Sequence, residues 1–119
     1  MSGVDILITQ GYICRNHRNE IDNLKRGGSD YTASLIGAAI KAQEIQIWTD
    51  VDGMMSADPR VVPNAKVLSE VSFQEASELA YFGAKVLHPM TIHTAVDKNI
   101  PVRILNTMNS SFPGTLIKA

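Results

Sequence analysis

The chain of 119 residues has 45% hydrophobic and 19% charged side chains, a composition typical of a soluble globular domain and not of a disordered tail. Its formal net charge of -1 hides no long block of one sign, which excludes the electrostatic pattern of a nucleic-acid or membrane-surface binder. Cys14, the single cysteine, cannot form an internal disulfide, and no apolar run approaches the roughly 18 residues of a membrane span. We therefore expect a cytoplasmic protein whose partners are small molecules or protein.

The first predicted elements are strands. Val4–Ile13 is short, apolar and rich in β-branched residues, which predicts a strand, and the polar run RNHRNE before Ile21 predicts a hairpin loop with a short return strand. The apolar run follows Met1 almost at once, without the basic start and cleavage site of a secretory signal. We expect a chain that begins abruptly, as a piece of a larger domain does.

A helix and a strand are predicted next. After the cluster KRGGSD, an apolar stripe at helical spacing predicts a helix with Ser29 as its N-cap. The stripe consists of Leu35, Ile36, Ala38, Ala39 and Ala42. A strand over 44–48 follows, with Ile45, Ile47 and the ring of Trp48 expected in the core. Together they form a helix-to-strand crossover of the kind that builds parallel sheets.

The second half predicts two more helices. Ser72 and Glu75 form a capping-box pattern ahead of the first, which should end near Gly83. Its buried face would hold Phe73, Ala76, Leu79, Ala80 and Phe82. The second helix should begin around Pro89 and end at Asn99 before Pro101. It is expected to bury Ile92, Ala95 and Val96.

Two strands complete the predicted order. Residues 102–105 return as a strand, and TLI at 115–117 forms a last short edge strand after a loop. The alternation of strands and helices predicts a three-layer α/β sandwich, or part of one.

Polar side chains crowd the end of the 44–48 strand. They are Thr49, Asp50, Asp52, Ser56, Asp58 and Arg60. Open parallel sheets bind ligands at the carboxyl ends of their strands, which favours a nucleotide or small-metabolite site here. The loop to about Asn64 is longer than a simple turn requires, but Asp, Gly and Pro are also ordinary turn residues. By itself, the segment leaves both interpretations open.

The run RGGSD, Arg26 to Asp30, joins two glycines to a helix start. Backbone N–H groups and the helix dipole can therefore approach an anionic ligand closely. Arg26 can clamp a carboxylate or phosphate, and Ser29 and Asp30 can accept hydrogen bonds from an ammonium group. The same run is more often only a turn, and it matches neither the P-loop nor the dinucleotide fingerprint.

The run FGAKVLHP places Lys85 just beyond a predicted helix end, where a cation interacts favourably with the exposed carbonyls or reaches a nucleotide phosphate. His17, His88 and His93 lack the spacing of a zinc site. Cys14 has no activating partner in the sequence. We therefore predict no metal-binding residue and no covalent nucleophile.

Four long segments, taken in order, resemble the aspartate kinases of the amino-acid-kinase family: RGGSDYTASLIGAAI, IQIWTDVDGMMSADPRVVPNAKVL, SFQEASELAYFGAKVLHP and NIPVRILNTMNSSFPGTLI. FGAKVLHP distinguishes the chain from family members that act on UMP, acetylglutamate or glutamate. The resemblance implies an amino-acid-kinase (carbamate-kinase-like) fold, a partial three-layer α/β sandwich with a mainly parallel sheet. Residues 1–119 would form the C-terminal, nucleotide-binding half of the catalytic domain.

The resemblance also implies an activity, in which ATP, with Mg²⁺ bridging its phosphates, transfers its γ-phosphate to the β-carboxylate of L-aspartate. This reaction begins lysine, threonine and methionine biosynthesis. The implied substrate-binding residues are Arg26, Gly27, Gly28, Ser29 and Asp30, with Asp30 also catalytic. The implied nucleotide-binding residues are Thr49, Asp50, Met55, Asp58, Arg60 and Lys85.

Some positions depart from the family pattern. Lys25 stands where a glycine often precedes the RGGSD arginine, and Met55 stands where many relatives carry an aromatic residue against the nucleotide. The N-terminal KFGG phosphate motif and the regulatory ACT domains are absent. We therefore expect an inactive piece of an aspartate kinase, either alone or fused to homoserine dehydrogenase, that self-associates as a homo-oligomer, a dimer. The alternatives are a non-catalytic nucleotide-binding or dimerisation module, and a glutamate 5-kinase-like enzyme.

Overall fold

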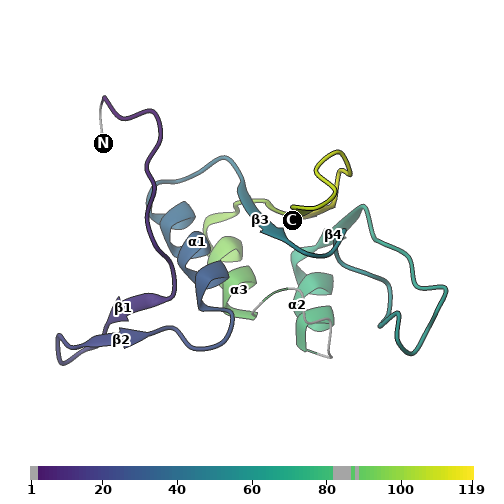
Figure 1. The fold of residues 1–119 in the computed structure, drawn as a ribbon, viewed down its shortest axis with the longest axis horizontal. Helices are drawn as coiled ribbons and strands as arrows, with labels where there is room; N and C mark the ends of the chain where they lie inside the picture. Colours follow the sequence, from purple (N-terminus) through teal and green to yellow (C-terminus); the bar gives the residue numbers. More distant parts are fainter. Residues whose placement is uncertain (1–2, 82–86, 88) are drawn as a thin grey trace.

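The computed structural model describes residues 3–81, 87 and 89–119 (Figure 1). The described elements, in chain order, are β1 (Ile13–Arg15), β2 (Ile21–Asn23), α1 (Gly28–Ala39), β3 (Ile45–Thr49), β4 (Glu70–Ser72), α2 (Phe73–Tyr81), α3 (Pro89–Lys98), β5 (Val102–Asn106) and β6 (Thr115–Lys118). The predicted helix end at Gly83 and the predicted burial of Phe82 lie outside these residues. Among the described residues, every helix is too short or too polar to cross a lipid bilayer.

A four-stranded mixed sheet organises the fold, in the order β3-β5-β6-β4. The pairs β3–β5 and β4–β6 are parallel, and β5–β6 is antiparallel. This confirms the α/β class and corrects one detail, because β6 was predicted as an edge strand and lies inside the sheet. Gly114, with φ 71°, allows this return beside β5, since a Cβ there would lie 1.9 Å from the carbonyl oxygen of Ile104.

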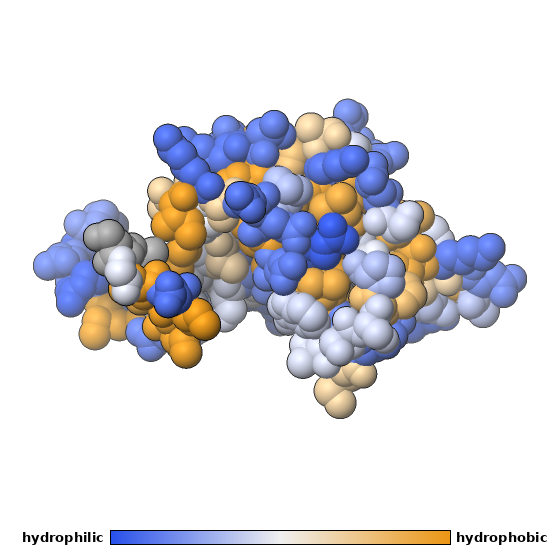
Figure 2. Space-filling view, turned by 90° about the horizontal axis from the view of Figure 1, so that it is seen from above, coloured by the Kyte–Doolittle hydropathy of each residue, from blue (hydrophilic) through white to orange (hydrophobic). Residues whose placement is uncertain are grey.

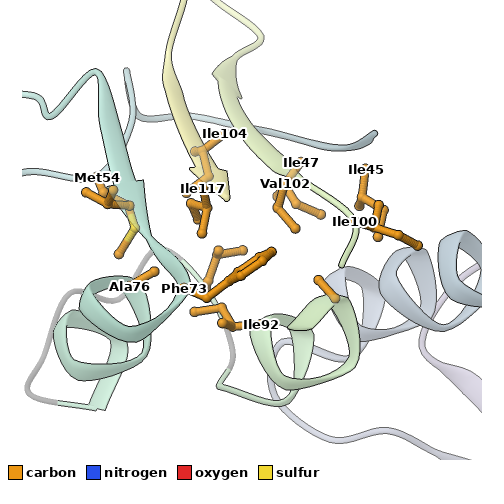
Figure 3. Packing of buried hydrophobic residues seen from close by; sticks show 13 residues of the cluster. Ile45, Ile47, Met54, Phe73, Ala76, Ile92, Ile100, Val102, Ile104 and Ile117 are labelled. Carbon is orange, nitrogen blue, oxygen red and sulfur yellow. The ribbon is translucent and has the colours of Figure 1, made fainter. Parts of the chain in front are cut away.

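The three helices cover one face of the sheet, and the hydrophobic core lies between them (Figures 1 and 3). Alternate strand residues point toward the helices, as the two-residue period of a strand requires. The core includes Ile45, Ile47, Val71, Phe73, Ala76, Ile92, Ala95, Val102, Ile104 and Ile117. The described residues thus supply two layers of the predicted sandwich, one of strands and one of helices.

Helix α1 packs through small residues and not through its predicted apolar stripe. Ser34 and Gly37 are buried, whereas Leu35 and Ile36 are 40% and 38% exposed. The Ser34 hydroxyl donates to the carbonyl oxygen of Thr91 on α3 at 2.8 Å, and a Cβ on Gly37 would lie 2.6 Å from Ile45. Close approach to α3 and β3 therefore selects small side chains, which overrides the periodicity of the larger ones.

The start of α1 also differs from the prediction. Its N-cap is Gly27 in the left-handed conformation, without a side-chain hydrogen bond, and Ser29 lies one residue inside the helix. Glycine adopts this conformation without steric cost, so the helix begins two residues earlier than a cap at Ser29 would place it.

The predicted strand at Val4–Ile13 is wrong over most of its length. Residues 4–10, which we call the N-terminal arm, form no regular element, and Ile8 is 91% exposed. Only the hairpin is confirmed, because β1 pairs with β2. Figure 2 shows apolar side chains on the surface at this end of the molecule. A β-branched segment without a neighbouring strand has no hydrogen-bond ladder to join, whatever its propensity.

Two further core predictions are wrong. Trp48 is 48% exposed, and its indole N–H donates to the Gln46 side chain at 3.1 Å. The alternation that buries Ile45 and Ile47 sends both residues to the opposite face of the sheet. On α3, Ile92 and Ala95 are buried as predicted, but Val96 is 42% exposed.

Thr91 takes the place predicted for Val96 in the buried face of α3. This face lies against α1, where the Thr91 carbonyl accepts the Ser34 hydrogen bond. Contact with α1 therefore decides which side of α3 is covered.

Candidate functional site

The RGGSD motif and the end of β3 lie toward the same edge of the sheet. Gly37 contacts Ile45, and only five residues, 40–44, connect α1 to β3, so the helix and the strand run in opposite directions. The helix spans about 13 Å from this contact back to Gly28. The strand spans about the same distance from the contact forward to Thr49, so both ends reach the same edge. β5 is parallel to β3 and ends at this edge with Asn106. Such edges are where open α/β sheets bind ligands.

The glycines of RGGSD are required by the backbone. Gly27 has φ 73°, and its carbonyl accepts the first helical hydrogen bond, from the Tyr31 N–H at 3.1 Å. A Cβ on Gly28 would lie 2.8 Å from the Leu24 side chain and 3.1 Å from the ring of Tyr12. The motif therefore begins the helix with little side-chain bulk, so the hairpin packs closely against Gly28, whose N–H donates to the Lys25 carbonyl at 3.1 Å.

The other predicted substrate residues flank this helix start. Arg26 and Ser29 are exposed, and Asp30 is half-buried in the first turn of α1. A guanidinium and a serine hydroxyl beside helical N–H groups can recognise a carboxylate, while a carboxylate in the first turn can attract a cationic group.

The hairpin of β1 and β2 is fastened to the same helical turn, through residues that the sequence analysis missed. The Tyr12 N–H donates to the Thr32 hydroxyl at 3.0 Å, and that hydroxyl donates to the carbonyl of Gly28 at 3.0 Å. The Leu24 N–H donates to the carbonyl of Tyr12 at 2.8 Å. A threonine in the first turns of a helix is the available signal, since its hydroxyl commonly bonds to the carbonyl four residues earlier.

The predicted nucleotide residues Thr49 and Asp50 lie at the end of β3, where the Thr49 hydroxyl donates to the Asp50 carboxylate at 3.3 Å. The Thr49 carbonyl accepts the Thr107 N–H at 2.8 Å, which continues the β3–β5 pairing into the loop. Asp50 and Val51 are exposed just beyond this point. The backbone is thus held while the side chain of Asp50 is open to a ligand.

The loop is held again three residues further on. The Met54 N–H donates to the Thr115 hydroxyl at 2.9 Å, and Met54 is fully buried. The Thr115 hydroxyl in turn donates to the carbonyl of Leu68. A Cβ on Gly53 would lie 2.3 Å from the Thr115 oxygen, so only glycine allows the chain to pass here.

Beyond Met54 the loop runs out and back as an irregular hairpin. The half-buried Met55 forms a β-bridge with Val67. Asp58 and Arg60 pair with each other, with 2.8 Å between the Arg60 Nη2 and an Asp58 oxygen. The hydrogen bonds that Arg60 donates to the Asp58 carboxylate, and then the charge of that carboxylate, raise the pKa of Arg60 above its ordinary value. Among the predicted nucleotide residues, the structure therefore brings together two separate pairs. One is Asp58 with Arg60, and the other is Thr49 with Asp50.

Lys85 and His88 lie outside the described residues. Within the described part of the chain, no three acidic, histidine or cysteine side chains gather to hold a metal ion. Two residues near Thr49, Asn106 and Asn109, were not singled out in the sequence; both donate hydrogen bonds to Asp52, which was named only as a member of the polar cluster after the strand. The rule that found Thr49 also points to Asn106, because Asn106 ends the neighbouring parallel strand.

The mixed sheet and its single described helix layer define an α/β protein, and its structural neighbours give it an amino-acid-kinase fold. Residues 1–106 match the amino acid kinase family, and the chain belongs to that family. A UMP kinase from Bacillus anthracis, at 20% identity and a TM-score of 0.65 over 76% of this chain and 40% of that one, shares the fold alone.

The more similar relatives are aspartokinases, which confirms the resemblance. The chain is 50% identical to the chloroplastic bifunctional aspartokinase/homoserine dehydrogenase 1 of Zea mays, over 95% of this chain and 12% of that protein. It is 48% identical to the chloroplastic aspartokinase 2 of Arabidopsis thaliana, over 92% of this chain and 20% of that protein.

Among solved structures, E. coli aspartokinase III in complex with aspartate and ADP matches with a TM-score of 0.86 and 47% identity, over 92% of this chain and 24% of that one. The chain therefore spans less than a quarter of the length of these aspartokinases.

Proposed function

We propose that the complete protein containing this chain is an aspartate kinase, which transfers the γ-phosphate of ATP to the β-carboxylate of L-aspartate. The observation that carries the proposal is the position of two motifs, RGGSD and TDVDG, at one sheet edge in a chain 47% identical to an aspartokinase solved with aspartate and ADP. In this proposal residues 1–119 are the C-terminal, nucleotide-binding half of the catalytic domain.

The proposed roles follow from the chemistry of each side chain. Arg26 binds a carboxylate of aspartate, Gly27 and Gly28 let backbone N–H groups approach it, and Ser29 and Asp30 bind the amino group. Asp30, through this contact with the substrate, is the proposed catalytic residue. Thr49, Asp50 and Met55 line the nucleotide site, and Asp58, Arg60 and Lys85 lie toward adenosine or phosphate.

The mechanism is one of positioning and electrostatics. In phosphoryl transfer, charge develops on the oxygens of the moving group, and preorganised N–H donors and cations stabilise it. The N–H groups of the first turn of α1 after Gly28 and the guanidinium of Arg26 are donors of this kind. Such a transfer needs no protein nucleophile.

The chemistry of the strand end fits Mg²⁺ delivered with the nucleotide. Mg²⁺ keeps several waters and binds substrate phosphates together with one or two carboxylates, and Asp50 offers one exposed carboxylate beside β3. When bound, the ion would neutralise phosphate charge. Asp50 would contribute to holding it, while Arg26 holds the acceptor.

We also propose a cytoplasmic homodimer. The single cysteine supports a reducing compartment, and exposed apolar side chains on α1, Leu35, Ile36 and Ile40, support association. Cell fractionation and light scattering of the complete protein test these two points, and a monomer at high concentration would contradict the second.

A coupled assay of ADP release from the complete protein tests the function. L-Aspartate should support turnover and L-glutamate should not, and the 119-residue chain alone should be inactive. Arg26→Ala should raise the KM for aspartate about tenfold or more, because it removes the charge-assisted hydrogen bonds to the substrate carboxylate. Arg18→Ala, on the exposed hairpin, is the matched control and should match the wild type. Equal turnover with glutamate would overturn the proposal.

A further inference from the structure

Asp52 joins the loops that follow two neighbouring parallel strands. One of its carboxylate oxygens, Oδ1, accepts two hydrogen bonds, from the side-chain amide of Asn106 at 2.9 Å and from that of Asn109 at 3.3 Å. Asn106 is the last residue of β5 and pairs in register with Thr49, the last residue of β3. The cluster therefore lies directly beside the proposed nucleotide residues.

The orientation of Asn106 is fixed by its own neighbours. Its side-chain oxygen accepts the Met108 N–H at 2.9 Å, which directs its amide nitrogen toward Asp52. Its backbone carbonyl accepts the Asn109 N–H at 3.1 Å, which shapes the turn that brings Asn109 to the same oxygen. Asp52 and Asn106 are half-buried, so these bonds are partly shielded from competing water.

Asp52 completes a set of fixed points around Asp50. Before Asp50, the carbonyl of Thr49 is held by the Thr107 N–H. After Asp50, the N–H of Met54 is held by the Thr115 hydroxyl. Without Asp52, the backbone between Thr49 and Met54 would be held only at its ends. The half-buried amide group of Asn106 would also lose its acceptor, which is unfavourable unless the loops rearrange.

We infer that Asp52 is a positioning residue for nucleotide binding, which acts through Asn106 and Asn109 to hold Thr49 and Asp50 in their binding orientation. The inference rests on the proposed nucleotide role of Thr49 and Asp50. Asp52 acts as a hydrogen-bond acceptor at a fixed place and not through its charge. Its effect is confined to nucleotide binding, because the residues proposed to bind the substrate L-aspartate lie at the start of α1.

The test uses four variants of the complete protein: Asp52→Ala, Asp52→Asn, Asn106→Ala and the Asp52→Ala/Asn106→Ala double variant. Asp52→Ala should weaken ADP binding and raise the KM for ATP, each about tenfold, with the KM for aspartate within about twofold of the wild type. Asp52→Asn keeps an oxygen that accepts both amides and should restore ADP affinity to within about twofold of the wild type. Because Asp52 and Asn106 act through one contact, the double variant should be no weaker than Asp52→Ala.

Asp97→Ala, which removes an exposed carboxylate on α3, is the matched control and should not change either KM. The inference is overturned if Asp52→Asn is as impaired as Asp52→Ala, since the charge would then be what matters. It is also overturned if the KM for aspartate rises equally, or if only Tm falls. ADP binding by calorimetry needs no turnover, so a failure of the wild type to phosphorylate aspartate would count against the proposed function and leave the binding test intact.

Discussion

The sheet core and the N-terminal arm are both rich in branched apolar residues, yet they end in opposite environments. Ile104 and Ile117 are fully buried between strands and helices, whereas Ile8 is 91% exposed. In the core, β5 and β6 pair with each other and with strands on both sides. The comparison shows that apolar sequence becomes core only where neighbouring strands and a covering helix are present.

The largest expected effect comes from truncating one isoleucine in each region. Ile117→Ala should destabilise the 119-residue chain by about 3 kcal/mol, because it removes buried methyl groups and leaves a cavity. Ile8→Ala should change stability by less than about 0.5 kcal/mol, since the side chain is already in water. Urea unfolding followed by circular dichroism measures both. Equal losses would mean that the arm is packed in solution and would abolish the contrast.

A hydroxyl offers a finer version of the same comparison. Thr115→Val keeps the shape but removes the acceptor of the Met54 N–H and the donor to the Leu68 carbonyl. Leaving both groups unpaired in the interior should cost about 2 kcal/mol.

Thr9→Val is the matched substitution in the arm, where the hydroxyl makes only an exposed contact with the neighbouring carbonyl. It should cost less than about 0.5 kcal/mol. Urea midpoints that shift equally for Thr115→Val and Thr9→Val would show that the buried pair of hydrogen bonds adds nothing to stability.

Local signals in the sequence predicted the parts of the fold that depend on near neighbours. The alternation of Ile45 and Ile47 predicted β3, and Ser72 with Glu75 predicted the start of α2, which is confirmed. The buried face of α1 could not be predicted this way. Ser34 and Gly37 are inside because α3 and β3 approach closely, and that approach is a property of the assembled fold.

The same limit applies to the candidate site. The polar cluster after β3 indicated the edge of the sheet that we propose as the site, and Thr49 ends the strand as expected. The hydrogen bonds from Asn106 and Asn109 to Asp52 depend on β5 lying beside β3. Two residues more than 50 positions apart in sequence become partners only once strand order is known, so no spacing rule identifies them.

The smallest expected effect concerns the capping box, which is local in sequence and exposed to solvent. The Ser72 N–H donates to the Glu75 carboxylate at 2.8 Å, and the Glu75 N–H donates to the Ser72 hydroxyl at 3.1 Å. The backbone hydrogen bond from Ser72, followed by the one with its side chain, lowers the pKa of Glu75 below its ordinary value. A carboxylate with a lowered pKa in the folded state stabilises the fold above its unfolded pKa, and this contribution disappears as pH falls through the folded value.

Glu75→Gln should therefore remove part of the loss of stability between about pH 5 and pH 3, because the amide oxygen can still accept the Ser72 N–H but cannot titrate. Urea midpoints across this pH range measure the difference in stability between Glu75→Gln and the wild type. Glu78→Gln, one turn further along α2, is the matched control. An NMR titration of the Glu75 carboxyl checks the cause directly. A Glu75 pKa at or above that of a glutamate in an unfolded chain would contradict the capping-box assignment, since protonation would then cost the helix nothing. The start of α2 is therefore intermediate between the two regions compared above. Like the core, it forms regular structure, which the N-terminal arm does not. Like the arm, it is exposed to solvent.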